Sequence, residues 1–125
     1  MTTLGAALVH VAPGEVDLGF AARPDLTQQN GFVHAGAISA VADSANGYAA
    51  FTLAPAGTDV LAVEFKINLL APARARCYVA RGRVLRAGRT LTVCRADVFG
   101  IAEDGTEGLV ATMLSTIIVR PTIAP

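Results

Sequence analysis

The chain has 125 residues, which is enough for one domain with a single core and too few for two, so residues 1–125 are expected to form one domain. Its 10 Lys and Arg residues balance 10 Asp and Glu residues, so no net charge attracts it to nucleic acid or to a membrane surface. Hydrophobic residues make up 53% of the chain and charged residues only 16%, which favours an apolar subunit interface, although abundant alanine accounts for part of this.

Targeting and metal signals are weak throughout the sequence. The first residues lack a basic segment followed by a long apolar run, so a secretory signal is not expected and the predicted location is the cytoplasm. The two longest uncharged runs contain amides, glycine or proline, which argues against a membrane span. Cys77 and Cys94 are expected to be free thiols. His10 and His34 have no clustered acidic or cysteine partners, so neither a metal site nor another cofactor is expected.

The first elements in chain order form a predicted β-hairpin. Residues 4–12 and 15–23 flank the dipeptide Pro13-Gly14, which is typical of tight turns. Apolar residues alternate with polar residues or glycine from Glu15 to Phe20, which is the period of a half-buried strand. Residues 24–34 are polar and contain glycine, so they are expected to form a loop.

From residue 35 to about residue 52 the sequence predicts one long helix. This stretch is rich in alanine, lacks proline, and is long enough for four to five turns. It is apolar on nearly every side, which predicts a helix buried all round. Pro55 and Gly57 lie in the loop that ends it.

Four strand-like runs follow the helix, separated by short connectors rich in glycine, proline and charged residues. Two strands, one helix and four further strands make a segregated α+β pattern, which suggests an antiparallel sheet curled around a single helix. The pattern indicates the class and leaves the strand order open. The four predicted strands are residues 60–70, 76–85, 90–99 and 109–119.

Asp43 is the residue best placed for chemistry. The sequence lacks a nucleophile elbow, a phosphate loop and a dinucleotide-binding glycine pattern. Between Asp25 and Asp59, however, Asp43 is the only charged residue, and it stands in the middle of the predicted helix. An ionised carboxylate there is costly unless it is paired or faces a wet cleft. The alternative is a structural aspartate satisfied by Ser39 and Asn46, which lie on the same helical stripe.

The start of the helix is a second candidate site. His34, Ala35 and Gly36 stand where the loop becomes a helix, and the first turn there has unpaired backbone N–H groups and the positive end of the helix dipole. Such a terminus stabilises a developing oxyanion during attack on a carbonyl. Asp43 lies about 10–13 Å further along the helix axis. If both features act on one thioester, the carboxylate must come from a neighbouring subunit.

Basic residues are segregated from acidic ones in the second half of the chain. No acidic residue occurs between Lys66 and Ala96, which favours an anionic ligand such as the phosphates of coenzyme A. The alternative is that these charges occupy ordinary solvent-facing strand positions. Tyr78 is the only aromatic residue there, which makes nucleic acid a poor partner. The basic residues are Lys66, Arg74, Arg76, Arg81, Arg83, Arg86, Arg89 and Arg95.

Two segments carry a family resemblance. Residues 28–36 read QQNGFVHAG, with Asp43 nine residues after His34, and this resembles the hallmark of the phenylacetyl-CoA (PaaI-type) hotdog thioesterases. Residues 63–73 and the Gly88-Arg89-Thr90 turn are similar to two further family segments. The resemblance extends from about residue 5 to residue 120. It implies the hotdog fold, in which an antiparallel β-sheet wraps around one long central helix, and a homodimer that assembles into a homotetramer.

The resemblance also implies residue roles in an acyl-CoA thioesterase. The Ala35 amide, with His34, would polarise the thioester carbonyl. Asp43 of the partner subunit would act as nucleophile or as the base that activates water. Gln28 matches a family Asn and would orient water or substrate. The remaining expected substrate-binding positions are Asn30, Gly36, Ala62 (where some relatives have a serine), Arg86 and Arg89.

The sequence therefore favours hydrolysis of an acyl-CoA to a free carboxylic acid and coenzyme A. One alternative is a hotdog hydratase or dehydratase, which needs a catalytic pair of His with Asp or Glu. Another is a non-catalytic acyl-CoA binding module on the same scaffold. Thiol release from a panel of acyl-CoAs, measured with the wild type and with Asp43→Asn, distinguishes them.

Overall fold

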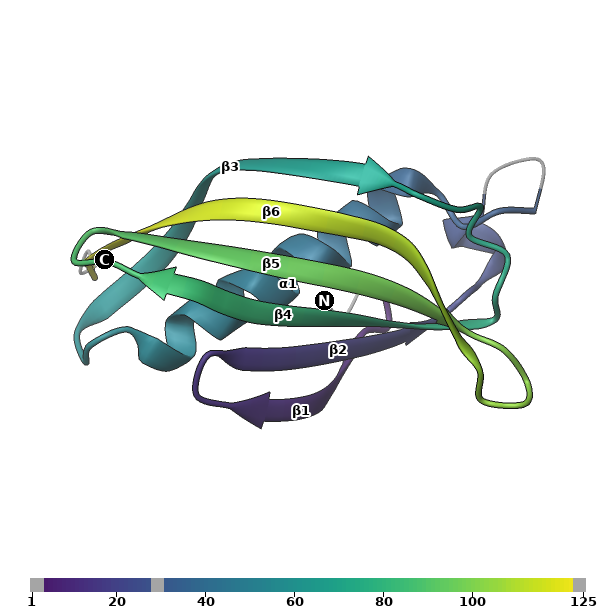
Figure 1. The fold of residues 1–125 in the computed structure, drawn as a ribbon, viewed down its shortest axis with the longest axis horizontal. Coiled ribbons are helices and arrows are strands. Elements are labelled where there is room, and N and C mark those ends of the chain that lie inside the picture. The colour runs from purple at the N-terminus through teal and green to yellow at the C-terminus, as the bar shows by residue number, and fades with distance from the viewer. Residues whose placement is uncertain (1–3, 28–30, 123–125) are drawn as a thin grey trace.

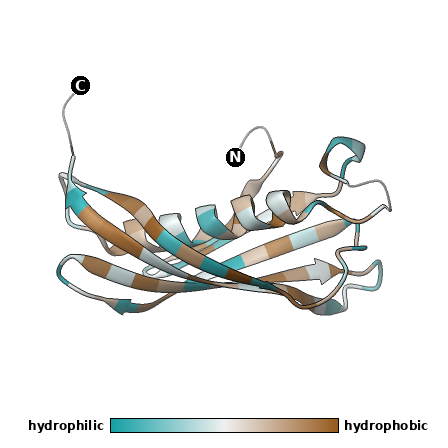
Figure 2. Cartoon of the chain, turned by 90° about the horizontal axis from the view of Figure 1, so that it is seen from above, coloured by the Kyte–Doolittle hydropathy of each residue, from teal (hydrophilic) through white to brown (hydrophobic). Residues whose placement is uncertain are grey.

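A computed structural model describes residues 4–27 and 31–122. Gln28 and Asn30, two of the expected site residues, lie outside the described residues. One long helix lies against a single antiparallel sheet, and the strands curve around it (Figures 1 and 2). The element order is β1 (Ala7–Ala12), β2 (Glu15–Ala21), a short 3-10 helix (Pro24–Leu26), α1 (Ala35–Leu53), β3 (Thr58–Leu69), β4 (Cys77–Ala87), β5 (Leu91–Ile101) and β6 (Glu107–Pro121).

The predicted α+β class, the hairpin, the long helix and the four later strands are confirmed. Gly14 occupies the turn of the hairpin with a φ of 75°, a conformation that glycine adopts without strain. The loop predicted over residues 24–34 also contains the 3-10 helix, which begins at Pro24 and has no side-chain cap.

The strand order, which the sequence left open, is β1-β2-β4-β5-β6-β3. Each neighbouring pair of these strands is antiparallel. The chain therefore leaves the sheet after β2, forms α1, and returns at the opposite edge as β3. This crossover stretches α1 across the inner face of the sheet, and it leaves β3 and β1 as the two edge strands.

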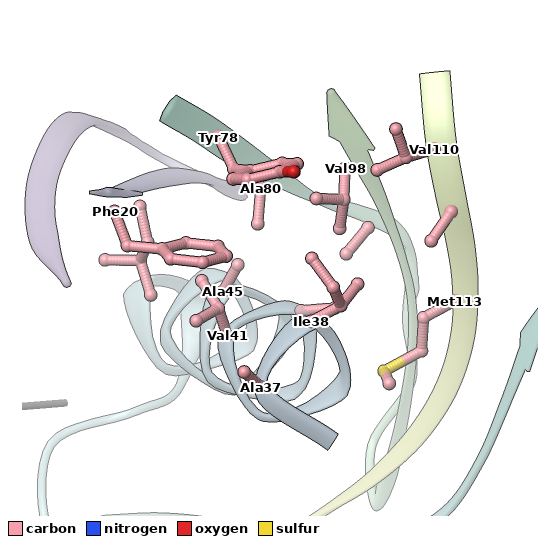
Figure 3. Close-up of a cluster of buried hydrophobic side chains, with 14 of the residues drawn as sticks. Phe20, Ala37, Ile38, Val41, Ala45, Tyr78, Ala80, Val98, Val110 and Met113 are labelled. Carbon is pink, nitrogen blue, oxygen red and sulfur yellow. The ribbon is translucent and has the colours of Figure 1, made fainter. Parts of the chain in front are cut away.

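The core forms between α1 and the inner face of the sheet. Ile38, Val41 and Ala45 point from the helix toward the strands (Figure 3). On the sheet side, Phe20 of β2 stacks on Tyr78 of β4 with ring centroids 5.1 Å apart. Aromatic pairs of this kind add about 0.5–1.5 kcal/mol beyond the area they bury. The core thus fixes which face of α1 is turned away from the sheet.

The prediction that α1 is buried all round is wrong for the single chain. Its sheet-facing residues are buried, but Tyr48 and Phe51 are 49% and 50% exposed on the other side. Alanine occurs on every side of this helix, so the contrast between its faces is small and the sequence does not reveal which one is open. The open face is the one that carries the candidate site.

Candidate active site

Asp43 is the only charged residue of α1. One carboxylate oxygen, Oδ1, is buried and has no hydrogen-bond partner among the described residues. Burial raises the pKa of this carboxyl above its ordinary value because the charged form loses solvation. Asn46 Oδ1 and the Tyr78 hydroxyl are also buried without a partner, but Asp43 is the only one of the three that belongs to a carboxylate, whose charged form makes an unpaired buried oxygen most costly.

The neighbouring polar side chains do not satisfy Asp43. The Ser39 hydroxyl donates to the carbonyl of Ala35 at 2.8 Å. The Asn46 amide donates to the Ser115 hydroxyl at 2.9 Å, across to the sheet and away from the open face. The structural interpretation, an aspartate held by hydroxyls and amides of its own helix, is therefore not supported.

Asp43 faces a pocket of about 760 Å³ between α1 and the edge strand β3. Ala62 lines the same pocket, so the structure brings together these two expected site residues. Pockets of roughly 300–1,000 Å³ with an apolar lining and a few polar groups are typical of small-molecule sites. The full lining is Asp43, Ser44, Gly47, Tyr48, Phe51, Asp59, Val60, Leu61, Ala62, Val63, Glu64 and Phe65.

The sequence alone gave Tyr48, Phe51 and Phe65 no clear position, and the structure places all three in the Asp43 pocket. Tyr48 and Phe51 follow Asp43 by five and eight residues in the predicted helix, and this spacing could have placed them near it. Phe65 lies on β3, and only the strand order shows that β3 returns beside the helix.

The helix start is the second part of the candidate site. His34 is the N-cap of α1, and its Nδ1 accepts a hydrogen bond from the Gly36 amide at 2.9 Å. The His34 carbonyl accepts from the amides of Ala37 and Ile38. The Ala35 amide has no hydrogen-bond partner among the described residues. One backbone N–H at the positive end of the helix is thus left to a ligand.

A pocket of about 580 Å³ opens at this helix start. It is lined by Ile38 from the next turn of α1 and by the segment between β3 and β4, which includes Pro72. Apart from His34, its lining side chains are apolar. Its lining residues are Phe32, Val33, His34, Ala35, Ile38, Leu69, Leu70, Ala71, Pro72, Ala73 and Val110.

The two pockets have no lining residue in common. Asp43 lies eight positions after Ala35 on the same helix, which is about 12 Å along its axis. A single chain therefore does not bring the carboxylate and the helix start to one reacting carbonyl.

Four of the eight basic residues between Lys66 and Arg95 form ion pairs with acidic residues of the described chain. Arg81 binds Glu107 through two hydrogen bonds of 2.8 and 2.7 Å, and Arg83 donates to Asp17 at 2.6 Å. The predicted anionic site therefore does not include Arg81 and Arg83, because the fold brings acidic residues of other strands beside them. Arg95 and Arg76 are also paired, with Asp97 and Glu103.

Arg86 and Arg89 form no ion pair within the described part of the chain. They lie at and beside the turn between β4 and β5, at the end of the sheet opposite the start of α1 (Figure 1). Neither lines the His34 pocket or the Asp43 pocket of its own chain.

Three further features of the described residues bear on metal binding, membrane insertion and thiol chemistry. Within residues 4–27 and 31–122, no three His, Cys, Asp or Glu side chains are grouped closely enough to hold a metal ion. In the same residues, no helix has the length and hydropathy needed to span a bilayer. Cys94 is buried, which raises the pKa of its thiol to about 11, so it is a poor nucleophile.

Comparison with known proteins identifies relatives over almost the whole chain. A thioesterase family protein of Silicibacter pomeroyi, known from a crystal structure, is 45% identical, with 98% of this chain and 89% of that chain aligned at a TM-score of 0.94. Two inferred esterases of Saccharolobus solfataricus are each 30% identical, over 75% and 93% of this chain and 66% and 74% of those proteins.

A mutant of the phenylacetic acid degradation protein PaaI from Thermus thermophilus is more distant, at 28% identity and a TM-score of 0.82, with 94% of this chain and 96% of that chain aligned. These structures confirm the hotdog fold. The Thioesterase superfamily matches residues 30–107, which include the helix start, Asp43 and Ala62. The chain belongs to the Thioesterase superfamily, and this membership supports thioester hydrolysis as its general chemistry.

Proposed function

We propose that this protein is a PaaI-type acyl-CoA thioesterase, which hydrolyses an acyl-CoA to a free carboxylic acid and coenzyme A. The observation that carries the proposal is the Asp43 carboxylate, which is half-buried in a mainly apolar pocket with one oxygen unpaired among the described residues. A structural aspartate would have found a partner, whereas a catalytic one must keep an oxygen available.

The reaction uses the two parts of the site in different ways. The Ala35 amide, with Nε2–H of His34, donates to the thioester carbonyl oxygen and stabilises the negative charge that develops there. Asp43 attacks the carbonyl carbon or removes a proton from the attacking water. The carbon–sulfur bond then breaks, and the thiolate of coenzyme A leaves and takes up a proton.

Two protomers build each site. Asp43 lies about 12 Å along the helix from Ala35 of its own chain, so it acts at the helix start of its partner. The edge strand β3 offers the surface for this dimer because its backbone pairs with β6 on one side only. Its exposed Leu61, Val63 and Phe65 are apolar and adjoin the Asp43 pocket. A two-fold axis at β3 makes the two helices antiparallel, which creates two equivalent sites, and two such dimers form a homotetramer.

The coenzyme A part of the substrate meets the positions that the family resemblance implies. Arg86 and Arg89, whose guanidinium groups have no acidic partner within the described residues, bind the phosphates. Gly36 and Ala62 are small and leave room for the thioester and the acyl group. Gln28 and Asn30 complete the site by orienting water or substrate.

The hydratase or dehydratase and the non-catalytic binding module fit the contacts of His34 and Asp43 less well. A hydratase or dehydratase needs a histidine paired with a carboxylate, but Nδ1 of His34 accepts from a backbone amide. His34 forms no hydrogen bond with an acidic side chain within the described residues. The histidine–carboxylate pair that does form joins His10 to Glu15 on the β1–β2 hairpin, and neither residue lines the His34 pocket or the Asp43 pocket. A non-catalytic binding module would not require an unpaired carboxylate in its pocket.

Thiol release from a panel of acyl-CoAs tests the proposed activity. The wild type is expected to release coenzyme A from at least one aromatic or medium-chain substrate, and Asp43→Asn is expected to lose at least about 10²-fold in kcat. Asp59→Asn is the matched control because Asp59 is an exposed carboxylate that lines the same pocket. Equal activity of Asp43→Asn and wild type would dismiss the mechanism. Binding of acyl-CoA without turnover would show a binding module instead.

A single-turnover reaction in oxygen-18 water then tests for direct attack by Asp43, which label in the protein carboxylate would identify. Direct attack forms an acyl anhydride with the side chain, and its hydrolysis at the aspartyl carbon puts label into the carboxylate of the protein. General-base catalysis puts the label into the product acid alone.

A further inference from the structure

A second apolar hollow lies on the other side of α1 from the Asp43 pocket. It has a volume of about 500 Å³ and separates α1 from the β1–β2 hairpin. Leu8 and Val11 of the edge strand β1 are 61% and 52% exposed at its rim. None of its lining side chains is charged, and its residues are Ala6, Leu8, Val11, Val16, Leu18, Tyr48, Phe51 and Thr52.

Tyr48 and Phe51 belong to both hollows. They are three residues apart on α1, so their side chains are neighbours on one face of the helix. Both are about half exposed, at 49% and 50%, on the face turned away from the sheet. The two rings therefore form the wall between the Asp43 pocket and the second hollow.

The chemistry of the two hollows differs. The Asp43 pocket is also lined by Asp59 and Glu64, two exposed acidic residues. The only polar side-chain groups that line the second hollow are the Thr52 and Tyr48 hydroxyls. The Thr52 hydroxyl donates to the Ala49 carbonyl and accepts from the Gly14 amide, so it is already paired. An uncharged, apolar space of this kind suits a hydrocarbon and does not suit the nucleotide of coenzyme A.

The spacing of Asp43, Tyr48 and Phe51 along α1 sets how far the two rings lie from the carboxylate. Tyr48 lies five residues beyond Asp43 on α1, about 7.5 Å along the axis, and Phe51 lies a turn further. An acyl group that extends from Asp43 toward the C-terminal end of α1 therefore meets the two rings. A chain that is too long for the first pocket meets this wall.

We propose that Tyr48 and Phe51 set the acyl-chain length that the enzyme accepts, by closing the Asp43 pocket off from the second hollow. This inference rests on the proposed thioesterase function and deepens it. With both rings present, chains that end at the wall are the best substrates. With either ring removed, the two hollows join, and longer chains gain a place to bury their terminal methylene groups.

The test measures kcat/KM for straight-chain substrates from acetyl-CoA to palmitoyl-CoA. Phe51→Ala and Tyr48→Ala are expected to shift the optimum to longer chains. Each methylene that reaches the second hollow should raise kcat/KM roughly fourfold, so two should raise it roughly tenfold or more. Tyr48→Phe keeps the ring and is expected to keep the wild-type profile. Leu53→Ala is the matched control, because Leu53 is an exposed apolar residue of the same helix that lines neither hollow.

The possible outcomes separate this inference from the proposed function. An active wild type whose chain-length profile is unchanged in Phe51→Ala and Tyr48→Ala overturns the inference and leaves the thioesterase function standing. A wild type that releases no thiol from any chain overturns both. Sedimentation of the same variants gives a second readout. Dissociation of the assembly without a change of profile would show that the two rings contact a second copy, and it would overturn the inference.

Discussion

The Gly36 amide donates a hydrogen bond to Nδ1 of His34 across 2.9 Å, within the first turn of α1. Because Nδ1 is the acceptor, the neutral imidazole carries its proton on Nε2, where it is a donor to a ligand. The same bond occupies the Gly36 amide. The Ala35 amide between these residues is therefore the backbone donor that the helix start offers to a substrate.

Ala35→Pro should remove this donor while it preserves the helix. Ala35 is the first residue of α1, where proline is well tolerated, and His34 has the extended backbone (φ −62°, ψ 136°) that a residue before proline prefers. We expect kcat to fall by about 10²–10³ with little change in the thermal melting temperature. Ala35→Ser keeps the N–H and is the control. Equal kcat values for the two variants would show that the Ala35 amide does not stabilise the transition state.

The pH dependence of the reaction should report Asp43. Only the ionised carboxylate attacks or accepts a proton, and burial raises its pKa above the ordinary value of 3.8. Activity should therefore be lost as pH falls through this raised pKa, so the acidic limb of kcat/KM should have its midpoint above 3.8. Asp59→Asn should leave the limb in place. A midpoint at or below the ordinary value would contradict the raised pKa of Asp43.

Asp43 should also lower the stability of the protein at neutral pH. The pKa of Asp43 is higher in the folded state than in the unfolded state, so between these two pKa values the folded state binds more protons. The free energy of unfolding therefore falls as pH rises through this window. Because Asp43 is only partly buried, solvent screening limits the effect, and Asp43→Asn should raise the free energy of unfolding by less than about 1 kcal/mol at neutral pH and by nearly nothing at about pH 3. Denaturant titrations at several pH values measure this. A stabilisation independent of pH, or a loss of stability, would contradict the unpaired, desolvated carboxylate.

Gly82 of β4 sets how closely the sheet approaches α1. A β-carbon at this position would lie 2.5 Å from the carbonyl oxygen of Ala45, two residues after Asp43 on the helix. Gly82→Ala should therefore destabilise the fold by at least about 1–3 kcal/mol, as overpacking does. Gly108→Ala is the control, because a β-carbon there meets no atom within 4 Å. Equal unfolding midpoints for the two variants would show that the helix does not rest on this strand.

The sequence predicted the elements well because their signals are local. Alternating apolar residues predicted β2, and an alanine-rich run without proline predicted α1. His34 and Asp43 were also recognised from local signals, as a residue at the helix start and as a lone charge within an apolar run. The structure confirms that His34 caps the helix and that Asp43 lies in a pocket.

The features that the sequence did not predict depend on which strands become neighbours. Asp17 and Arg83 are 66 residues apart, and only the β2–β4 register brings them to 2.6 Å. This is why the basic residues could not be recognised as paired. In the same way, the open face of α1 depends on how the helix is placed against the sheet by the crossover to β3. The sequence of the helix does not reveal this placement, because alanine occurs on all its sides.

Mixing two inactive variants tests the shared site most directly. In an Asp43→Asn chain the helix start is intact, and in an Ala35→Pro chain the carboxylate is intact. After refolding an equal mixture, half of the dimers contain one chain of each kind, and each of these has one site with both parts intact. With a site shared by two protomers, the mixture should recover about one quarter of the wild-type thioesterase rate. A mixture no more active than the separate variants would contradict a site built by two protomers.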